Sequence, residues 1–548
     1  MNERFEISIQ SFRIFKLQSN TFMKLFTLLL AFFFSIQLQA QQTYWQQQLR
    51  YNINATLDDQ EKSITGGETI VYKNNSPDSL NFIWFHLWAN AYRSDSTALI
   101  QQIKNDKERL KKMETFGTGS ISGLDFKVNG KAVKTAPHPN PQYIDILQVL
   151  LDNPLLPGDS ISISTTFKVM LPPYFSRSGF ADGEFMACQW YPKPAVYDKS
   201  GWHEFPYLDM GEFYSEYGDY NVSLTLPSDY IVSATGVLQT ASELDAYKKI
   251  GAQNVASRND NPALYVAANK KEKTLNYYAT QVPDFAWFAD KGFVIQYDTI
   301  QLSGSTTIDA FSFYHNKKKT IWKNSIDYIK DGIRNYSNWI GEYGYPVVQV
   351  VEGPKNNSSG GMEYPMVTLI TSPDAKEETL DAVIVHEVGH NWFMSMLGSN
   401  ERAHTWMDEG LNTYFQFRYE AEKYKSNSIF GDAIPKEVKQ MPTEQFLKTI
   451  YNVINQNIPM QSAMDISAEK FPDSGEYGLI SYIKTALWMH LLENTIGWDK
   501  LQLAVHNYFN KWKNKHPQPE DMQAAFEEAT GTNLNAFFAL TKKEGKFE

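Results

Sequence analysis

The segment Val383–Phe393, VIVHEVGHNWF, constrains this chain more than any other stretch. His386 and His390 are four positions apart, and Glu387 directly follows the first of them, which gives the pattern H-E-x-x-H. Residues four apart lie on one face of a helix, so two imidazoles with this spacing can hold one metal ion. Glu387 would then lie beside the ion, where it can act as a base on a metal-activated water. The pattern predicts a helix that carries a catalytic metal centre.

A catalytic zinc site takes three protein ligands and leaves one position open for water. His386 and His390 supply two imidazoles, so a carboxylate or another imidazole has to reach the ion from a nearby element. Glu409, in the segment TWMDEGLNTYF nineteen residues after His390, is the candidate third ligand. The alternative is an amphipathic helix whose polar face carries these residues by coincidence. The combined spacing favours one zinc ion per chain.

Two further segments lie on either side of this pattern in the sequence: GGMEYPM at Gly360–Met366 and SYIKTALWMHLLE at Ser481–Glu493. Together with HEVGH and Glu409 they resemble the gluzincin zinc aminopeptidases, the family of aminopeptidase N and leukotriene hydrolase. GGMEYPM is similar to the family's G-x-M-E-N exopeptidase motif, and the later segment is similar to the one that carries the family's catalytic tyrosine. The resemblance runs from about Tyr51 to the end of the sequence.

The resemblance implies two catalytic residues, Glu387 and Tyr482. Tyr482 matches the position of the family's tyrosine, and Lys484 follows it as in the family's Y-x-K pattern. Its hydroxyl would support the negative charge that develops on the substrate carbonyl oxygen. Tyr477 is the nearby alternative for this role, and a buried structural tyrosine is the non-catalytic interpretation.

The resemblance also implies a site for the free ammonium group of a peptide. Glu363 in GGMEY matches the family's amine-binding glutamate, although Tyr364 replaces the asparagine that usually follows. Glycines beside it allow the backbone to pass close to the substrate. The substrate-binding residues implied in this way are Gly360, Gly361, Met362, Glu363 and Gln189. A second amine-binding acid cannot be assigned from the sequence.

Length, charge and cysteine content restrict the class of protein. A chain of 548 residues is long enough for about two to four domains. The net charge of −11 argues against a nucleic-acid partner, because nucleic-acid-binding proteins carry basic patches. Cys188 is the only cysteine, so the chain has no internal disulfide. We interpret Cys188 as a small buried apolar side chain.

Residues 1–40 have the features of a secretory signal peptide. Leu25–Leu38 is an apolar run preceded by Lys24, and the end of the run fits cleavage after Ala40. A start of translation at Met23 would give the usual signal length. The run is shorter than the roughly 20 residues of a membrane-spanning helix, although a membrane anchor is the alternative. We expect an exported protein, periplasmic or extracellular, with no stable membrane span after cleavage.

Hydrophobic periodicity divides the chain into two parts. From Tyr44 to about Ile300, alternating segments such as YNINATLD and SISISTTFKV predict antiparallel strands. After about Ala310 the period becomes helical, first between Trp322 and Tyr336, and two further strands are expected at Val347–Gly353 and Pro365–Ile370. We predict an α+β multidomain protein.

The resemblance adds detail to this division. It implies an N-terminal antiparallel β-sandwich or saddle domain at 41–305. It also implies a thermolysin-like, mostly helical catalytic domain at 306–548, with no clear C-terminal helical domain after it.

Residues and resemblance together predict a zinc-dependent aminopeptidase that releases N-terminal residues from peptides by attack of a zinc-activated water. An endopeptidase or a dipeptide-releasing enzyme of the same fold is the first alternative, if Glu363 does not bind the amine. A non-catalytic peptide-binding protein is the second, although the presence of Glu387 disfavours it. The expected partners are peptide substrates.

Overall fold

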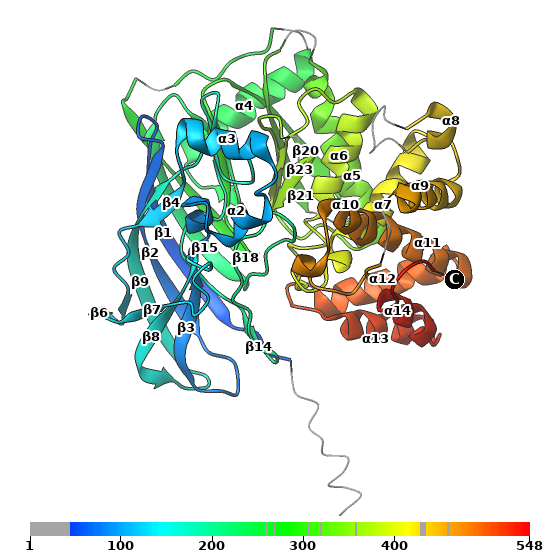
Figure 1. The fold of residues 1–548 in the computed structure, drawn as a ribbon. Helices are drawn as coiled ribbons and strands as arrows, with labels where there is room; N and C mark the ends of the chain where they lie inside the picture. The colour runs from blue at the N-terminus through cyan, green and yellow to red at the C-terminus, as the bar shows by residue number, and fades with distance from the viewer. Residues whose placement is uncertain are drawn as a thin grey trace, which may run out of the picture. The chain divides into compact units, whose positions relative to one another are not determined.

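The computed structural model describes residues 44–258, 261–267, 269–304, 306–317, 320–356, 359–427, 434–457 and 461–547. The predicted signal peptide at 1–40 and the alternative start at Met23 lie outside the described residues. Gln46–Glu548 forms one compact unit (Figure 1). In the described part of the chain, no helix combines the length and the apolar character needed to cross a membrane.

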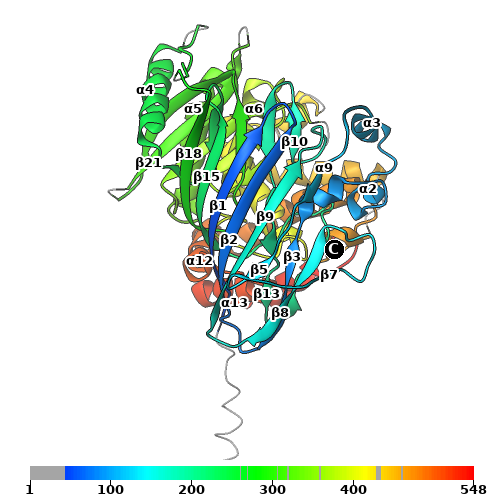
Figure 2. The same cartoon turned by 90° about the vertical axis from the view of Figure 1, so that its left-hand side faces the viewer.

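A nine-stranded sheet forms most of the N-terminal, β-rich region. In β1 (Gln48–Asp58) every second residue is buried, which is the alternation that predicted the strand. β1 pairs parallel with β15 (Gly218–Pro227) and antiparallel with β2 (Ser63–Lys73). Figure 2 shows these strands side by side in the sheet. The remaining strands are β4 (Ser120–Ser122), β5 (Lys127–Val128), β6 (Lys131–Ala132), β9 (Ser160–Met170), β17 (Val237–Leu238) and β18 (Glu272–Val282).

Three smaller sheets and four helices complete this region. The sheets are β10 (Gly179–Ala181) with β11 (Glu184–Ala187), β19 (Trp287–Asp290) and β16 (Ile231–Ala234); β12 (Lys193–Pro194) with β3 (Leu80–His86), β8 (Ile146–Leu155) and β7 (Thr135–Pro137); and β13 (Tyr197–Asp198) with β14 (Gly201–Trp202). The helices are η1 (Trp88–Tyr92), α2 (Ala98–Gln102), α3 (Lys107–Phe116) and α4 (Ala241–Ser257). Residues 203–217, between β14 and β15, form neither helix nor strand.

A five-stranded sheet links the β-rich region to the helices that follow. Its order is β20 (Phe293–Gln301), β21 (Thr307–His315), β22 (Val347–Glu352), β24 (Val367–Ile370) and β23 (Gly361–Tyr364). The three inner strands are parallel, and the two edge strands pair antiparallel. The two strands expected after Tyr336 correspond to β22 and β24. β20 precedes the predicted domain boundary at 305 and pairs with β21 beyond it, and the boundary itself stays a prediction.

Helices dominate the chain after β24, as the sequence predicts. α5 (Ser325–Trp339) contains most of the predicted amphipathic segment and buries Ile326, Ile329 and Ile333. It packs against α6 (Glu377–Gly389). The other helices are η2 (Ile321–Asn324), η3 (Thr405–Met407), α7 (Glu409–Lys423), α8 (Lys436–Lys439), α9 (Thr443–Asn457), η5 (Ala468–Lys470), α10 (Ser474–Gly478), η6 (Leu479–Lys484), α11 (Thr485–Ile496), α12 (Trp498–Trp512), α13 (Pro519–Thr530) and α14 (Asn535–Thr541).

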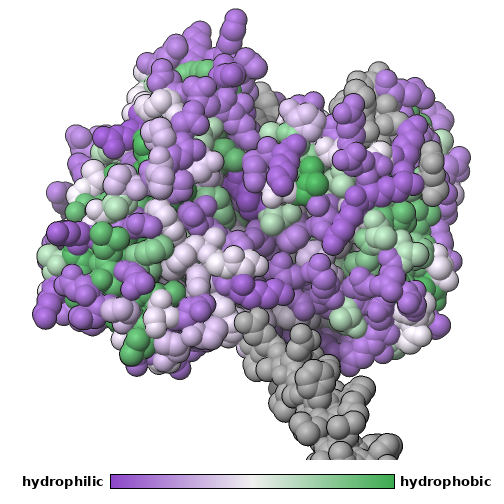
Figure 3. Space-filling model, turned by 60° about the horizontal axis from the view of Figure 1, so that its bottom comes forward, coloured by the Kyte–Doolittle hydropathy of each residue, from purple (hydrophilic) through white to green (hydrophobic). Residues whose placement is uncertain are grey.

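One apolar core extends through both regions. The largest cluster of buried apolar side chains includes Leu49 in β1 and Phe538 in α14. On the face shown in Figure 3, hydrophilic residues prevail and hydrophobic ones gather in two separate areas. Because the core is continuous, residues that are far apart in the sequence are held in fixed positions relative to one another.

Candidate metal centre and substrate cleft

Helix α6 presents the H-E-x-x-H residues from the interior of the protein. All its residues from Leu380 to Gly389 are buried, so the helix is packed on every side and not along one stripe alone. His386 and Glu387 lie in its last turn, and His390 follows as the C-cap residue. Glu409 is the first residue of α7. The two helices thereby bring the predicted ligands together in a space with little access to water.

The three predicted ligand atoms form a nearly equilateral triangle. His386 Nε2 lies 3.2 Å from His390 Nε2 and 3.3 Å from Glu409 Oε2. His390 Nε2 lies 3.4 Å from the same carboxylate oxygen. Ligands bound to zinc at about 2.0–2.1 Å in a tetrahedron are separated by about 3.3–3.4 Å. The triangle therefore has the size that one zinc ion requires.

Hydrogen bonds on the far side of each imidazole fix which nitrogen faces the centre. His390 Nδ1 lies 2.6 Å from Asp408 Oδ1, and His386 Nδ1 lies 3.0 Å from Gln416 Oε1. The Gln416 amide nitrogen donates to Glu420, so its oxygen faces the imidazole. These oxygens accept, so both Nδ1 atoms carry a hydrogen and the Nε2 atoms are the ones that face the centre. Two Nε2 atoms and a carboxylate thus face one another in a buried space, where a zinc ion would displace any proton from His390 Nε2.

The charges of the three ligands depend on one another. Burial and the neighbouring His390 lower the pKa of His386, although Glu409 opposes this shift. Burial also opposes charge on His390, but Asp408 and Glu409 outweigh it and raise the pKa of His390 well above its usual value. Although burial disfavours its charged form, the two imidazoles hold the pKa of Glu409 well below its usual value. An ionised carboxylate is therefore part of the set, as a zinc ligand has to be.

Glu387 points into the cleft beside the ligands. Burial raises the pKa of Glu387 to about 8 against the opposing effect of His390. A Cβ atom on Gly361 would lie 2.5 Å from Glu387 Oε1, whereas one on Gly360 would meet no atom closer than 3.8 Å. Strand β23 thus approaches the carboxylate so closely that a side chain at 361 would have to displace Glu387. The sequence suggested room for substrate at both glycines, and at Gly361 the room is needed by Glu387.

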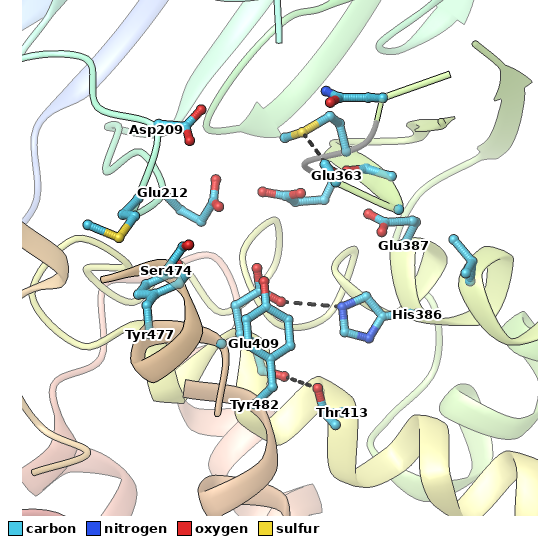
Figure 4. A pocket seen from close by; sticks show the side chains of 18 of the residues that line it. Asp209, Glu212, Glu363, His386, Glu387, Glu409, Thr413, Ser474, Tyr477 and Tyr482 are labelled. Carbon is cyan, nitrogen blue, oxygen red and sulfur yellow. Dashed lines mark hydrogen bonds and ion pairs between the residues drawn. The ribbon is translucent and has the colours of Figure 1, made fainter. Parts of the chain in front are cut away.

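The ligands line one wall of a cavity of about 740 Å³. This volume lies within the roughly 300–1,000 Å³ of sites that bind small molecules. Figure 4 shows Glu363 and Glu387 on one side, Glu409 and Tyr482 below, and Glu212 across the space from them. Glu212 comes from the irregular segment 203–217 of the β-rich region. Both regions of the protein therefore contribute to one cleft.

Glu363 belongs to a cluster of three buried carboxylates. Oxygens of Glu212, Glu363 and Glu401 lie within 4.8 Å of one another. Arg177 Nη1 lies 2.5 Å from Glu212 Oε2 and 3.8 Å from Glu363 Oε1. Burial raises the pKa of Glu363 well above its usual value, and Glu212 adds to this shift while Arg177 opposes it. Three carboxylates beside one guanidinium suit the binding of a further cation, such as an ammonium group.

Sequence reasoning missed Glu212 and Arg177, because neither lies in a motif. Glu212 is brought to the cleft by tertiary contacts of its main chain. Arg402 Nε donates to the Glu212 carbonyl oxygen at 3.2 Å. At Gly211, whose φ is +95°, an added Cβ would collide with the side chain of Ala468. The sequence offers one local signal here, the pair Gly211-Glu212, and this pair does not indicate which element the segment 203–217 approaches.

Tyr482 lies in η6, a single π-helical turn. Its ring is stacked beside the His386 imidazole with 6.1 Å between the ring centroids. Single π-helical turns within α-helices occur often at functional sites. η6 and α11 lie so close to α7 that a Cβ on Gly410 would collide with Thr485. Tyr477 also lines the cavity, so both tyrosines considered from the sequence reach it.

The other predicted substrate-binding residues lie in two places. Gly360, Gly361 and Met362 line the main cavity. Gln189 lines a separate cavity of about 30 Å³ that also borders Glu363. Its Oε1 accepts a hydrogen bond from the Tyr364 hydroxyl at 3.1 Å, so the tyrosine that departs from the family motif holds this side chain. A role for Gln189 in substrate binding stays a prediction.

Residues 326–540 match the model of the Peptidase family M1 domain. Leucine aminopeptidase 2 of Neosartorya fischeri is 31% identical over 192 residues, which cover 33% of this chain and 29% of that protein. Glutamyl aminopeptidase of Bos taurus is 24% identical over 250 residues, which cover 43% of this chain and 25% of that protein. The chain thus spans less than a third of the length of these relatives.

The similarity to solved structures extends over most of the chain. The crystal structure of an M1 zinc metallopeptidase from Deinococcus radiodurans matches with a TM-score of 0.61 and 15% sequence identity. The match covers 92% of this chain and 95% of the other. At this identity the similarity shows a shared fold, in which a β-rich N-terminal region precedes a helical C-terminal part.

Proposed function

The chain belongs to peptidase family M1 through its domain at residues 326–540, and on that premise we propose that it is a zinc-dependent aminopeptidase that removes N-terminal residues from peptides. The observation that carries the proposal is the shared cleft. The zinc-ligand triad and Glu387 line one wall, and Glu363 and Glu212 line the same cavity. An exopeptidase needs both a hydrolytic centre and a nearby acceptor for the ammonium group of its substrate.

Zinc held by His386, His390 and Glu409 would supply a polarised water and an electrophile for the peptide carbonyl oxygen. Glu387 accepts a proton from the attacking water and delivers it to the leaving amine. A hydroxyl in the cleft donates a hydrogen bond to the carbonyl oxygen as negative charge develops there. Tyr482 has this role in the proposal, and Tyr477 is the alternative.

Glu363 and Glu212 bind the substrate's ammonium group in this proposal. Their burial makes an added positive charge favourable, since carboxylates in a poorly solvated space need a cationic partner. Arg177 contacts both carboxylates and holds them in place. Glu401 adds a third carboxylate, so the cluster has more carboxylates than the one guanidinium can pair. The distance from this cluster to the metal centre then sets cleavage after the first residue.

Two other activities are compatible with the same centre. An endopeptidase or a dipeptide-releasing enzyme would result if the carboxylate cluster did not engage the amine. Glu212 favours the aminopeptidase, because it supplies the second acid that such a site needs. A peptide-binding protein without activity is the other candidate, and an intact Glu387 beside three zinc-ligating side chains argues against it.

Two finer proposals concern architecture and location. We propose that residues 41–305 are a saddle-like β domain and residues 306–548 a thermolysin-like catalytic domain. The sheet orders and the run of helices after β24 support this division. We also propose export to the periplasm or the extracellular space, on the basis of the signal-like segment at 1–40.

The test of function is hydrolysis of aminoacyl-nitroanilides beside their N-acetylated twins by the purified chain. We expect cleavage of the free-amine substrates alone, lost on addition of a zinc chelator and restored by zinc. Equal cleavage of the acetylated twins would identify an endopeptidase, and cleavage of dipeptidyl-nitroanilides to dipeptides would identify a dipeptide-releasing enzyme. Stoichiometric zinc without hydrolysis of any peptide would favour the binding protein.

A further inference from the structure

Lys484 is fully buried on the side of η6 that faces away from the cleft. Its Nζ donates to three main-chain carbonyl oxygens, those of Gly545 at 2.7 Å, Lys543 at 3.4 Å and Ser462 at 3.5 Å. The ring centroid of Phe547 lies 5.2 Å from the same nitrogen. An ammonium group removed from water is costly unless other groups bind it. These contacts therefore determine where the Lys484 side chain can lie.

Lys484 and Tyr482 belong to the same π-helical turn. Residues two positions apart in a helix project in different directions. Tyr482 accordingly points into the cleft (Figure 4), whereas Lys484 points toward Lys543–Phe547. On a third side, a Cβ on Gly410 of α7 would collide with the Ser481 carbonyl oxygen of the turn. The turn is thus held between α7 and the segment 543–547.

A π-helical turn is a rare, single-turn interruption of an α-helix, and the position of this one is set by the tertiary contacts around it. We propose that the segment Lys543–Phe547 is a positioning element for Tyr482 and acts through Lys484. The carbonyl oxygens and the Phe547 ring bind the ammonium group of Lys484. The bound lysine fixes the position of the end of η6, and the position of η6 determines where the Tyr482 hydroxyl lies in the cleft. The inference rests on the proposed function, in which Tyr482 acts on the substrate carbonyl oxygen.

This arrangement has a kinetic consequence. The segment 543–547 lies outside the set of residues that line the cavity, so its contacts affect neither the amine site nor the metal ligands directly. Misplacing a catalytic group by about 1 Å costs up to about 100-fold in rate. Loss of the contacts should therefore lower kcat, with KM and zinc content unchanged.

The experiment compares Lys484→Met and Phe547→Ala, each in the otherwise unchanged protein and in a Tyr482→Phe background. Lys542→Met is the matched control, because its side chain is 64% exposed and lies just before the segment. Alone, Lys484→Met should lower kcat by about tenfold or more and Phe547→Ala by a smaller factor. In the Tyr482→Phe background neither change should lower kcat further, because the group that they position is absent. The control should leave kcat unchanged in both backgrounds.

Three outcomes would overturn the inference. Full additional losses in the Tyr482→Phe background would show a general structural effect, and an unchanged kcat in both single variants would show no effect. If Tyr482→Phe itself hydrolyses normally while chelation still abolishes activity, the role of Tyr482 fails and the inference fails with it. Absence of hydrolysis by the unaltered protein would instead refute the proposed function. If Lys484→Met does not fold, Phe547→Ala decides, because that ring is only half-buried.

Discussion

Asp408 Oδ1 lies 2.6 Å from His390 Nδ1, and both side chains are almost completely buried. The Asp408 carboxylate contacts the imidazole of His390, and Asp408 directly precedes Glu409 in the sequence. In the proposed metal centre, Asp408 fixes the tautomer that turns Nε2 toward the ion and increases the basicity of the ring. The affinity for zinc should therefore depend on a residue that does not touch the ion.

We expect Asp408→Asn to weaken zinc binding by about 10–100-fold, because an amide oxygen is a weaker acceptor than a carboxylate. Competition with a chromophoric chelator measures this affinity. Asp381→Asn is the matched control, since Asp381 is a buried acid of α6 that contacts Tyr419 and Lys423 and not a ligand. Equal zinc affinities for the two variants would contradict the role assigned to Asp408.

Glu387→Gln should separate zinc binding from catalysis. The substitution keeps the size of the side chain but removes the base, so hydrolysis should fall by about 10²–10⁴-fold. Zinc content, measured by atomic absorption, should stay at one ion per chain. Hydrolysis at the unaltered rate would rule out Glu387 as the base.

Gly361→Ala and Gly360→Ala form a closely matched pair. The first places a Cβ 2.5 Å from Glu387 Oε1, and the second makes only ordinary van der Waals contacts at 3.8 Å or more. Gly361→Ala should displace the carboxylate and lower kcat by at least about tenfold, and Gly360→Ala should change it less than threefold. Steady-state kinetics on one free-amine substrate are sufficient to compare them. Similar losses in both would place the requirement for glycine elsewhere.

Glu212→Gln should weaken recognition of the substrate ammonium. A charge-assisted hydrogen bond contributes about 1.5–3 kcal/mol, so kcat/KM for free-amine substrates should fall by about 10–100-fold. A twin substrate with a hydroxyl in place of the amino group serves as the control. Its slower hydrolysis should be nearly unaffected by the substitution, and an equal loss for both substrates would point to a general disturbance of the cleft.

Asp145 gives a pH-dependent test of stability away from the cleft. Its Oδ2 accepts a hydrogen bond from the Tyr207 amide at 2.7 Å, and burial raises the pKa of Asp145 from 3.8 to about 7. Between these two values the folded protein holds a proton that the unfolded chain has lost. The contribution of Asp145 to the free energy of unfolding therefore falls as pH rises through this window and is lost above it.

Asp145→Asn removes this titration and retains an acceptor oxygen. Relative to the unaltered protein, the variant should gain roughly 2–4 kcal/mol of unfolding free energy between pH 4 and pH 8. Urea unfolding at several pH values measures the difference. A difference that does not change with pH would show that Asp145 is ionised throughout.

The proposed metal ligands could be picked out from the sequence because their spacing is a property of one helix and the start of the next. His386 and His390 are one helical turn apart, and Glu409 begins a helix of its own. The alternation of β1 and the apolar spacing of α5 are local in the same way. In these cases the residues whose pattern predicts the helix or strand are the same residues that make it up.

Glu212 and Arg177 could not be found in this way. Glu212 precedes Glu363 by about 150 residues and lies in a segment without regular structure. Its position depends on Arg402 and on the close approach at Gly211. Neither contact has a counterpart in a local pattern, because each depends on how two regions of the core meet.

The origin of Glu212 in the β-rich region has a consequence for damaged or partly assembled molecules. In the proposed aminopeptidase, a disturbance that moves the segment 203–217 but leaves α6 and α7 in place would keep His386, His390 and Glu409 together and remove Glu212 from the ammonium site, which would then rely on Glu363. We expect such a species to lose much of its preference for a free N-terminus. Under the proposed function, the preference for chain ends depends on how the two regions meet, whereas the hydrolytic centre depends on α6 and α7.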